Sequence, residues 1–358
     1  MSVAFRAVQW NRRKIVYDEF LLGGVALYIG IFMAAGRWWF SPAEHPATWE
    51  DLRVRAFGSC AFVMLTLILS IGPLARLDRR FLPLLYNRRH FGVLTFFVAS
   101  AHGWFTINWF LSRGIWSGFI SIVTNLPHYG SISHFPYETL GIIGLLVLFL
   151  MAATSHDFWL DFLTPPVWKA LHMVVYVIYG LLVMHVALGV MQSQHFSLIP
   201  ALLGGAAATV ASLHLVAGWR ERRIDRGTGA SSGGWVTVGP PRSIPNRRAR
   251  IVTARGGERI AVFRDGEYIG ALTNLCAHQN GPLGEGRIID GCVTCPWHGY
   301  QYRLDDGCAP PPFTDKLATY RVRINAGLVE VDPRPLPPGT RVPLASLHDM
   351  ETTRGLTL

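Results

Sequence analysis

The chain has 358 residues, of which 50% are hydrophobic and 16% charged, and its formal net charge at pH 7 is +10. This composition is too hydrophobic for one ordinary soluble domain, and the length allows two units. Apolar residues crowd into the part before about Ala217, while charge, proline and glycine dominate the remainder of the chain. We therefore expect a membrane part followed by a soluble part.

The membrane part contains six apolar stretches of about 20 residues, the length that crosses a bilayer as a helix. They predict an all-α bundle of six transmembrane helices. A basic cluster precedes the first stretch, as in a signal peptide, but no small-residue cleavage site comes after it. Trp38 and Trp39 at its end are typical of an interfacial anchor, so we expect a retained span. The stretches are roughly 21–40, 57–74, 91–111, 137–153, 168–190 and 198–218.

Basic residues are distributed unevenly between the connections of these stretches. They are many before the first stretch, between the second and the third, and after the sixth. By the positive-inside rule, both termini and the soluble part are expected on the cytoplasmic side of a bacterial-type inner membrane. The net charge then reflects topology and attraction to anionic membrane lipid, and nucleic-acid binding is the weaker interpretation. The basic residues are Arg6, Arg12, Arg13, Lys14, Arg76, Arg79, Arg80, Arg88, Arg89, Arg220, Arg222, Arg223 and Arg226.

Several histidines lie inside the apolar stretches, where an unpaired polar ring is costly and a function is the first hypothesis. His102 lies in the third stretch. His172 and His185 lie in the fifth, thirteen residues and about 20 Å apart along a helix axis. That separation suits two hemes stacked across the membrane, each held by imidazoles from facing helices. The alternative is a hydrogen-bonded core histidine, which we prefer for His214 on the sixth stretch.

The segments "NRRHFGVLTFFVASAH", "MAATS" and "WKALHMVVYVIYGLLVMH" resemble the ferric-reductase-like transmembrane domain over about 57–218. That family includes NADPH oxidases, ferric reductases and the heme-binding subunit of bacterial methionine-sulfoxide reductase systems, which this chain resembles most. The resemblance implies one or two b-type hemes. It implies that His102 and His185 bind the heme farther from the cytoplasm and that His172 binds the nearer one. His90 has the right depth to be the partner of His172, with an interfacial histidine as the alternative.

Between the two parts, "RGTGASSGG" predicts a short flexible linker. We therefore expect a transmembrane heme domain at 1–220, a linker at 221–233, a soluble domain at 234–335 and a tail at 336–358.

Four of the five cysteines lie in the soluble part, and two of them form boxes with histidine, Cys276-x-His278 and Cys295-x-x-His298. A cytoplasmic domain keeps its thiols reduced, which favours metal ligation over disulfides. Structural zinc sites usually draw on Cys-x-x-Cys knuckles, whereas each box here supplies one cysteine and one histidine. This arrangement suits a [2Fe–2S] cluster in which one iron takes both cysteines and the other takes both histidines, with zinc as the alternative.

The rest of the soluble part predicts an all-β module. "RIAVFRDGEYIGALTNLC" alternates apolar and polar residues around an Asp265-Gly266 turn, and "ATYRVRINAGLVEVDP" does so around 325–327, so both predict hairpins. We expect Cys292, on a strand leading into the second box, to be a small buried residue, and we assign Cys308 no role.

The two boxes resemble the Rieske ferredoxin motif, and the likeness extends over about 235–333. The resemblance implies a β-sandwich with the cluster loops at its tip. Gly281 and Trp297 stand where Rieske proteins of cytochrome bc complexes carry cysteines, so the disulfide between the loops is absent. Tyr300 stands where high-potential proteins have a serine donor, while Tyr302 matches the other hydroxyl donor. Fewer hydrogen bonds to sulfur predict a low reduction potential, roughly −150 mV.

The two resemblances together imply a membrane electron-transfer component of an oxidoreductase, in which no residue is assigned a catalytic role. A cytoplasmic one-electron donor or reductase would reduce the cluster at His278 and His298. The electron would pass to b-type heme and on to an acceptor across the membrane. Two alternatives stay open: a quinone-linked oxidoreductase, and a non-catalytic redox-sensing or assembly subunit.

Overall fold

The chain forms two compact units in its computed structural model. One unit contains the described parts of Arg12–Pro73 and Asn87–His214, and the other contains those of Leu74–Tyr86 and Leu215–Leu358. The described residues are 12–38, 47–85, 88–112, 130–131, 135–155, 159, 163, 165–192, 198–227, 231–232, 234–254, 257–277, 281–296, 299–311 and 313–348.

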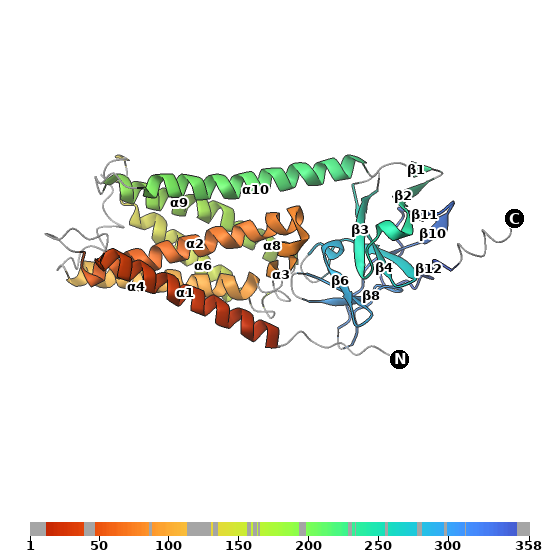
Figure 1. Cartoon of the computed structure of the whole chain (residues 1–358), viewed down its shortest axis with the longest axis horizontal. Coiled ribbons are helices and arrows are strands. Elements are labelled where there is room, and N and C mark those ends of the chain that lie inside the picture. The colour runs from red at the N-terminus through yellow and green to blue at the C-terminus, as the bar shows by residue number, and fades with distance from the viewer. Residues whose placement is uncertain are drawn as a thin grey trace. The chain divides into compact units, whose positions relative to one another are not determined.

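Long helices that run side by side make up the first unit (Figure 1). Apolar segments of this length form helices because every backbone N–H and C=O group must find its partner within the segment in lipid. The fifth predicted span is divided at Val174, whose N–H bonds to the carbonyl oxygen of Leu171. The described helices of the chain are α1 (Arg12–Trp38), α2 (Trp49–Leu77), α3 (Leu82–Leu85), α4 (Arg88–Ser112), α6 (Glu138–Ala153), α8 (Pro165–Met173), α9 (Val175–Gln192) and α10 (Ile199–Gly227). Of these, α3 and the C-terminal ends of α2 and α10 belong to the second unit.

The prediction of six transmembrane helices is correct only in part. Among the described residues, four helices are long and apolar enough to cross a membrane. At the third predicted span the chain forms α4, whose mean hydropathy is lowered by polar residues such as His102 and Asn108. At the fourth it forms α6, which has 16 residues and is therefore about 24 Å long, short of a bilayer core of about 30 Å. The four candidate spans are Ile15–Trp38, Trp49–Leu77, Ala170–Gln192 and Ile199–Arg223.

The outer surface of this unit is apolar. Phe20 is 77% exposed and Leu202 is 70% exposed, as expected for side chains that face lipid. Hydroxyl groups within the helices turn back onto the backbone, so that Thr66 donates to the carbonyl oxygen of Phe62 at 2.8 Å. Such bonds lower the cost of a polar group in lipid. Ser70, Thr95, Ser100 and Thr106 make the same bond to the carbonyl four residues earlier. These features are those of an integral membrane protein.

Tyr179 of α9 packs against α2 in the core of this unit. Its ring stacks on Phe62 of α2 with centroids 5.5 Å apart, and its hydroxyl lies 3.1 Å from the Thr66 hydroxyl. Around it, buried Leu65 of α2 and Leu148 of α6 fill the space between the helices. The apolar stretches therefore pack on one another through a minority of their side chains.

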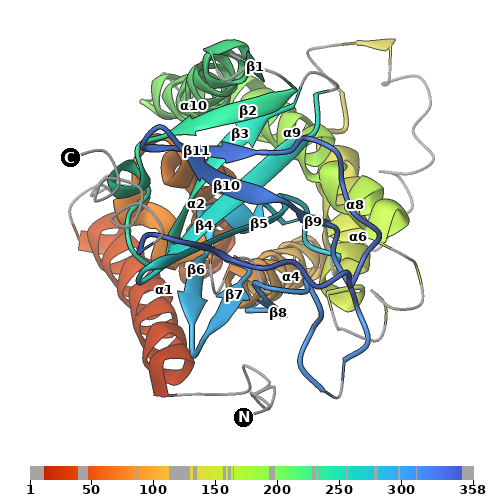
Figure 2. The ribbon, with the colours of Figure 1, turned by 90° about the vertical axis from the view of Figure 1, so that its right-hand side faces the viewer.

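The described residues of the second unit form β-strands in three sheets (Figure 2). The first sheet has the order β1-β2-β11-β10, the second β12-β5-β4-β3 with β9 beside β5, and the third β6-β7-β8. The strands are β1 (Ser231–Ser232), β2 (Trp235–Gly239), β3 (Arg248–Thr253), β4 (Arg259–Asp265), β5 (Tyr268–Thr273), β6 (Arg287–Ile289), β7 (Cys292–Thr294), β8 (Gln301–Arg303), β9 (Thr319–Tyr320), β10 (Val322–Asn325), β11 (Leu328–Val331) and β12 (Ala345–Ser346).

Strand β4 is buried on both faces. Ile260 and Val262 belong to a core cluster shared with the first sheet, whereas Ala261 and Phe263 belong to a cluster shared with the third. Because side chains alternate between the two faces of a strand, a continuous apolar run here serves two cores. The second sheet is thus the middle layer of the unit.

Both predicted hairpins are confirmed. Strands β4 and β5 pair antiparallel, with Asp265 opposite Tyr268 and Gly266 at φ +60° in the turn. Strands β10 and β11 pair in the same way around Ala326 and Gly327, which also have positive φ. Positive φ at the turn matches the right-handed twist of the flanking strands.

Candidate metal centres

Two short loops carry the cysteine and histidine boxes. Cys276 follows β5 and Cys295 follows β7, and the two residues are only 1% and 2% exposed. In each loop the cysteine N–H donates to the carbonyl oxygen five residues later, at 2.9 Å to Gly281 and at 2.8 Å to Tyr300. Two loops of different sequence thus close with the same hydrogen bond at the cysteine.

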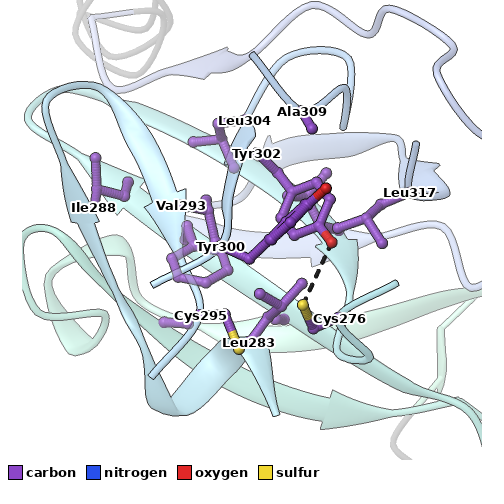
Figure 3. Packing of buried hydrophobic residues seen from close by; sticks show 14 residues of the cluster. Cys276, Leu283, Ile288, Val293, Cys295, Tyr300, Tyr302, Leu304, Ala309 and Leu317 are labelled. Carbon is purple, nitrogen blue, oxygen red and sulfur yellow. Dashed lines mark hydrogen bonds between the residues drawn. The ribbon is translucent and has the colours of Figure 1, made fainter. Parts of the chain in front are cut away.

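His278 and His298 lie outside the described residues, as does Trp297. Within the part of the chain that the structure describes, no three His, Cys, Asp or Glu side chains form a possible metal site. The four cluster ligands therefore stay a prediction. Cys276 and Cys295 belong to one buried cluster. Figure 3 shows the sulfur atoms of both cysteines together with Leu283, Tyr300 and Tyr302.

Tyr300, just before β8, and Tyr302, in β8, have different partners. The Tyr302 hydroxyl lies 3.3 Å from the Cys276 sulfur (dashed line in Figure 3), whereas the Tyr300 hydroxyl donates to Asp315 Oδ2 at 2.5 Å. Burial, followed by the neighbouring Cys276, raises the pKa of Tyr302 well above its usual range. Tyr302 therefore stays protonated and can donate a hydrogen bond to a thiolate at Cys276, as predicted from its position.

The other cysteines of this unit differ from the two in the boxes. Cys292 is fully buried in β7, as expected, and burial raises the pKa of its thiol. A protonated thiol is a poor metal ligand, so this environment suits a packing residue. Cys308 is partly exposed, and its sulfur lies 3.8 Å from the carbonyl oxygen of Asp306.

In the membrane unit, His102 of α4 and His185 of α9 face each other. Their ring centroids are 6.4 Å apart, and the ring planes meet at 79°. Two imidazoles bound to one metal at about 2 Å each have centroids roughly 6 Å apart once the rings are included. The spacing therefore fits a single iron between the two rings.

Hydrogen bonds fix which nitrogen of each ring could bind that iron. His102 Nδ1 lies 2.9 Å from the carbonyl oxygen of Val54, and His185 Nδ1 lies 2.8 Å from that of Tyr137. A carbonyl oxygen only accepts, so Nδ1 carries the proton and Nε2 keeps its lone pair. This is the arrangement that metal-binding histidines adopt.

His172 has the same pattern. Its Nδ1 donates to the carbonyl oxygen of Trp168 at 3.0 Å, and its ring stacks on the Trp168 ring with centroids 3.6 Å apart. Its Nε2 is buried and has no hydrogen-bond partner within the described residues. A buried nitrogen with a lone pair and no partner is costly, so this atom also fits a metal ligand.

His90, for which the sequence left two roles open, pairs with a carboxylate. Its Nδ1 lies 2.8 Å from Asp18 Oδ2 of α1, 72 residues away in the chain. Metal-bound histidines often donate their second N–H to a carboxylate, so this pair suits either a ligand or an interfacial ion pair. Asp18 is not among the residues predicted from the sequence, although an acidic residue beside an apolar stretch is a usable signal.

Both nitrogens of His214 have protein partners. Its Nδ1 donates to the carbonyl oxygen of Val210 at 2.9 Å, and its Nε2 lies 2.9 Å from the Tyr176 hydroxyl. No lone pair is left for a metal. His214 therefore joins α10 to α9, in agreement with the structural role expected for it.

Comparisons with known proteins address both units. The family model of the Rieske [2Fe-2S] domain matches residues 234–321, and that of the ferric reductase like transmembrane component matches residues 56–183. The ferredoxin subunit of anthranilate 1,2-dioxygenase from Burkholderia cepacia is 41% identical over 80 residues, which are 22% of this chain and 72% of that subunit.

Two further matches cover short parts of this chain. Cholesterol 7-desaturase from Ciona intestinalis is 30% identical over 89 residues, which are 24% of this chain and 19% of that protein. A solved chain from the complex of reduced oxygenase and oxidized ferredoxin in carbazole 1,9a-dioxygenase is 26% identical, covers 30% of this chain and 99% of that chain, and has a TM-score of 0.28. Both resemblances inferred from the sequence are confirmed by the family models. The chain therefore belongs to the Rieske [2Fe–2S] family, and its Rieske domain is fused to a ferric-reductase-like transmembrane domain in one membrane-embedded redox protein.

Proposed function

We propose that this protein conducts electrons across the membrane, from a cytoplasmic donor to an acceptor on the opposite side. A Rieske cluster and a b-type heme each supply a one-electron couple when bound. The observation that carries the proposal is the facing pair His102 and His185, with both Nδ1 atoms bonded to backbone and both Nε2 atoms left for one iron.

For the cluster we propose Cys276, His278, Cys295 and His298 as ligands. The matching hydrogen bonds of the Cys276 and Cys295 N–H groups support this set of ligands. Each bond places a cysteine at the start of a segment whose sequence also contains a histidine. Tyr302 orients a hydroxyl group toward Cys276. Zinc is the alternative, and metal analysis separates the two.

For the membrane we propose one heme between His102 and His185 and a second at His172. The partnerless Nε2 of His172 supports the second site, and its Trp168 contact holds the ring in place. His90 is the proposed partner of His172, supported by the carboxylate of Asp18 on its Nδ1. If His90 is only an interfacial residue, the second heme has a different second ligand or is absent.

The direction rests on topology. The basic residues around the first, third and sixth predicted spans support cytoplasmic termini and a cytoplasmic Rieske domain. A Rieske domain on that side receives electrons one at a time from a soluble donor. The relative from Burkholderia cepacia is named a ferredoxin subunit, which is an electron carrier, and by analogy we propose a cytoplasmic one-electron donor or reductase for this chain.

The test uses the full chain in lipid vesicles with an impermeant one-electron acceptor inside and a reduced flavoprotein outside. We expect reduction of the inner acceptor, lost in both Cys295→Ser and His185→Ala. Transfer that persists without His185 would contradict a path through the membrane histidines. Reduction that requires added quinol, and not the flavoprotein, would support the quinone-linked alternative instead.

A further inference from the structure

Each of the two facing histidines lies against a glycine of a neighbouring helix. A Cβ atom at Gly58 of α2 would lie 2.9 Å from both Cε1 and Nδ1 of His102. A Cβ atom at Gly141 of α6 would lie 3.0 Å from Cε1 and 3.2 Å from Nδ1 of His185. Real Cβ atoms hardly ever approach other atoms at 2.9 Å, so an alanine at Gly58 would have to displace the ring.

The hydrogen-bond acceptors of these histidines occupy the same position relative to the two glycines. Val54 precedes Gly58 by four residues, and Tyr137 precedes Gly141 by four residues. In an α-helix the carbonyl group of one residue points toward the residue four positions later, whose Cβ leans back toward the N-terminus. A side chain in place of either glycine would therefore block the access of a histidine ring from another helix to the carbonyl oxygen.

The membrane histidines outside this pair need no such glycine. His172 and His214 bond to Trp168 and Val210, the carbonyl groups four residues earlier in their own sequence. The Nδ1 atoms of His102 and His185 instead lie at a carbonyl oxygen of another segment, 48 residues away in the chain in both cases. The same arrangement, a histidine bonded to the carbonyl oxygen four residues before a glycine, thus occurs at both proposed ligands of the iron.

We propose that Gly58 and Gly141 are positioning residues for the proposed heme between His102 and His185. Each glycine exposes a backbone carbonyl that keeps the proton on Nδ1, turns Nε2 toward the iron and sets the plane of the ring. Together they fix the 79° angle between the two ring planes. This inference rests on the proposed heme ligands but assigns a role to residues that carry no functional group.

Ordinary helix packing is the competing explanation, because small residues let membrane helices approach closely. Gly144 of α6 supplies the matched case. It lies three residues from Gly141, and its Cβ would lie 2.9 Å from Leu182 Cδ2, so it makes room for an aliphatic side chain and not for a histidine. Gly92 of α4 and Gly180 of α9 have open space and serve as neutral positions.

The experiment compares alanine substitutions at these positions in the full-length protein. Heme content, the electron paramagnetic resonance spectrum of the oxidised protein and the midpoint potential of each heme are measured. The g values of a low-spin heme with two imidazoles report the angle between the ring planes. Loss of the bond at Nδ1 makes the imidazole less electron-rich and raises the midpoint potential.

We expect Gly58→Ala and Gly141→Ala to change the g values and raise the potential of one and the same heme. Gly144→Ala, Gly92→Ala and Gly180→Ala should leave both signals as in the wild type. The proposal is overturned if the first two variants keep wild-type signals, or if Gly144→Ala shifts them equally. A wild-type protein without heme would instead refute the proposed function itself.

A double substitution serves as the control for a variant that fails to fold. Alanine favours a helix more than glycine does, so any loss of folded Gly58→Ala protein must come from the clash with the ring. In Gly58→Ala/His102→Ala that ring is gone, and the yield should return to that of His102→Ala alone. If the double variant stays as poorly folded as Gly58→Ala, the glycine serves packing and the proposal fails.

Discussion

The hydroxyl group of Tyr300 donates its hydrogen bond to Asp315, whereas that of Tyr302 lies against the sulfur of Cys276. Of these two tyrosines, Tyr302 is the one whose hydroxyl group contacts the proposed cluster ligand Cys276. Hydrogen bonds to sulfur favour the reduced cluster and raise its potential. This difference supports the low potential expected from the sequence and gives the first prediction.

Replacing Tyr302 with phenylalanine should lower the midpoint potential of the cluster by about 40–60 mV, which corresponds to one hydrogen bond of about 1–1.4 kcal/mol for a one-electron couple. Tyr300→Phe is the matched control and should shift the potential far less, because its hydroxyl is held by Asp315. A redox titration followed by electron paramagnetic resonance measures both. Equal shifts in the two variants would contradict the assignment.

Two of the four cysteines of the Rieske domain should bind the cluster, and the other two should not. We expect Cys276→Ser and Cys295→Ser to abolish the Rieske signal, and Cys292→Ala and Cys308→Ala to keep it. Cys292→Ala leaves only a small cavity in a fully buried strand, so its effect is a modest loss of stability. Iron, sulfide and zinc are analysed after anaerobic reconstitution. One tightly bound zinc with no iron or sulfide would overturn the [2Fe–2S] assignment.

The Asp18–His90 pair should distinguish a ligand from an interfacial histidine. If His90 is the partner of His172, both His90→Ala and His172→Ala remove the same heme and leave about half of the total. Asp18→Asn should then retain that heme but raise its potential, since the carboxylate makes the imidazole more electron-rich. Heme content and redox titration measure these effects. Full heme content in His90→Ala would make His90 an interfacial residue.

The orientation rests on the basic residues alone and needs its own measurement. A reporter fused after residue 358 should report the cytoplasm, and one inserted near residue 127 should report the opposite side. Activity-based reporters such as alkaline phosphatase and a fluorescent protein give opposite readings on the two sides. A C-terminal reporter outside the cytoplasm would reverse the proposed direction of electron flow.

Local patterns in the sequence were sufficient for some parts of this structure and not for others. The turn at Asp265-Gly266 was predictable because positive φ and alternating strands are properties of neighbouring residues. The number of spans was not, because α4 contains polar residues such as His102 and Asn108 and is not among the four candidate spans of the described residues. Counting apolar stretches of about 20 residues therefore predicts more spans than the helices of the described residues support.

The residues that support the candidate site were beyond sequence reasoning for a different reason. Gly58 acts on His102 only through the packing of α2 against α4, and glycine is common in apolar helices. Asp18 meets His90 across 72 residues of chain. A histidine in an apolar stretch is recognisable by its chemistry, whereas a missing side chain or a distant carboxylate gains meaning only when helices are packed.

The central claim is that His102 and His185 hold one heme in a path across the membrane. The most direct test measures heme content by the pyridine hemochrome method in His102→Ala, His185→Ala and the double variant, with His214→Ala as control. We predict that each single change removes the same heme, that the double change removes no more, and that His214→Ala keeps the full amount because both its nitrogens bond to protein. Heme content in His185→Ala equal to that of the wild type would contradict the account.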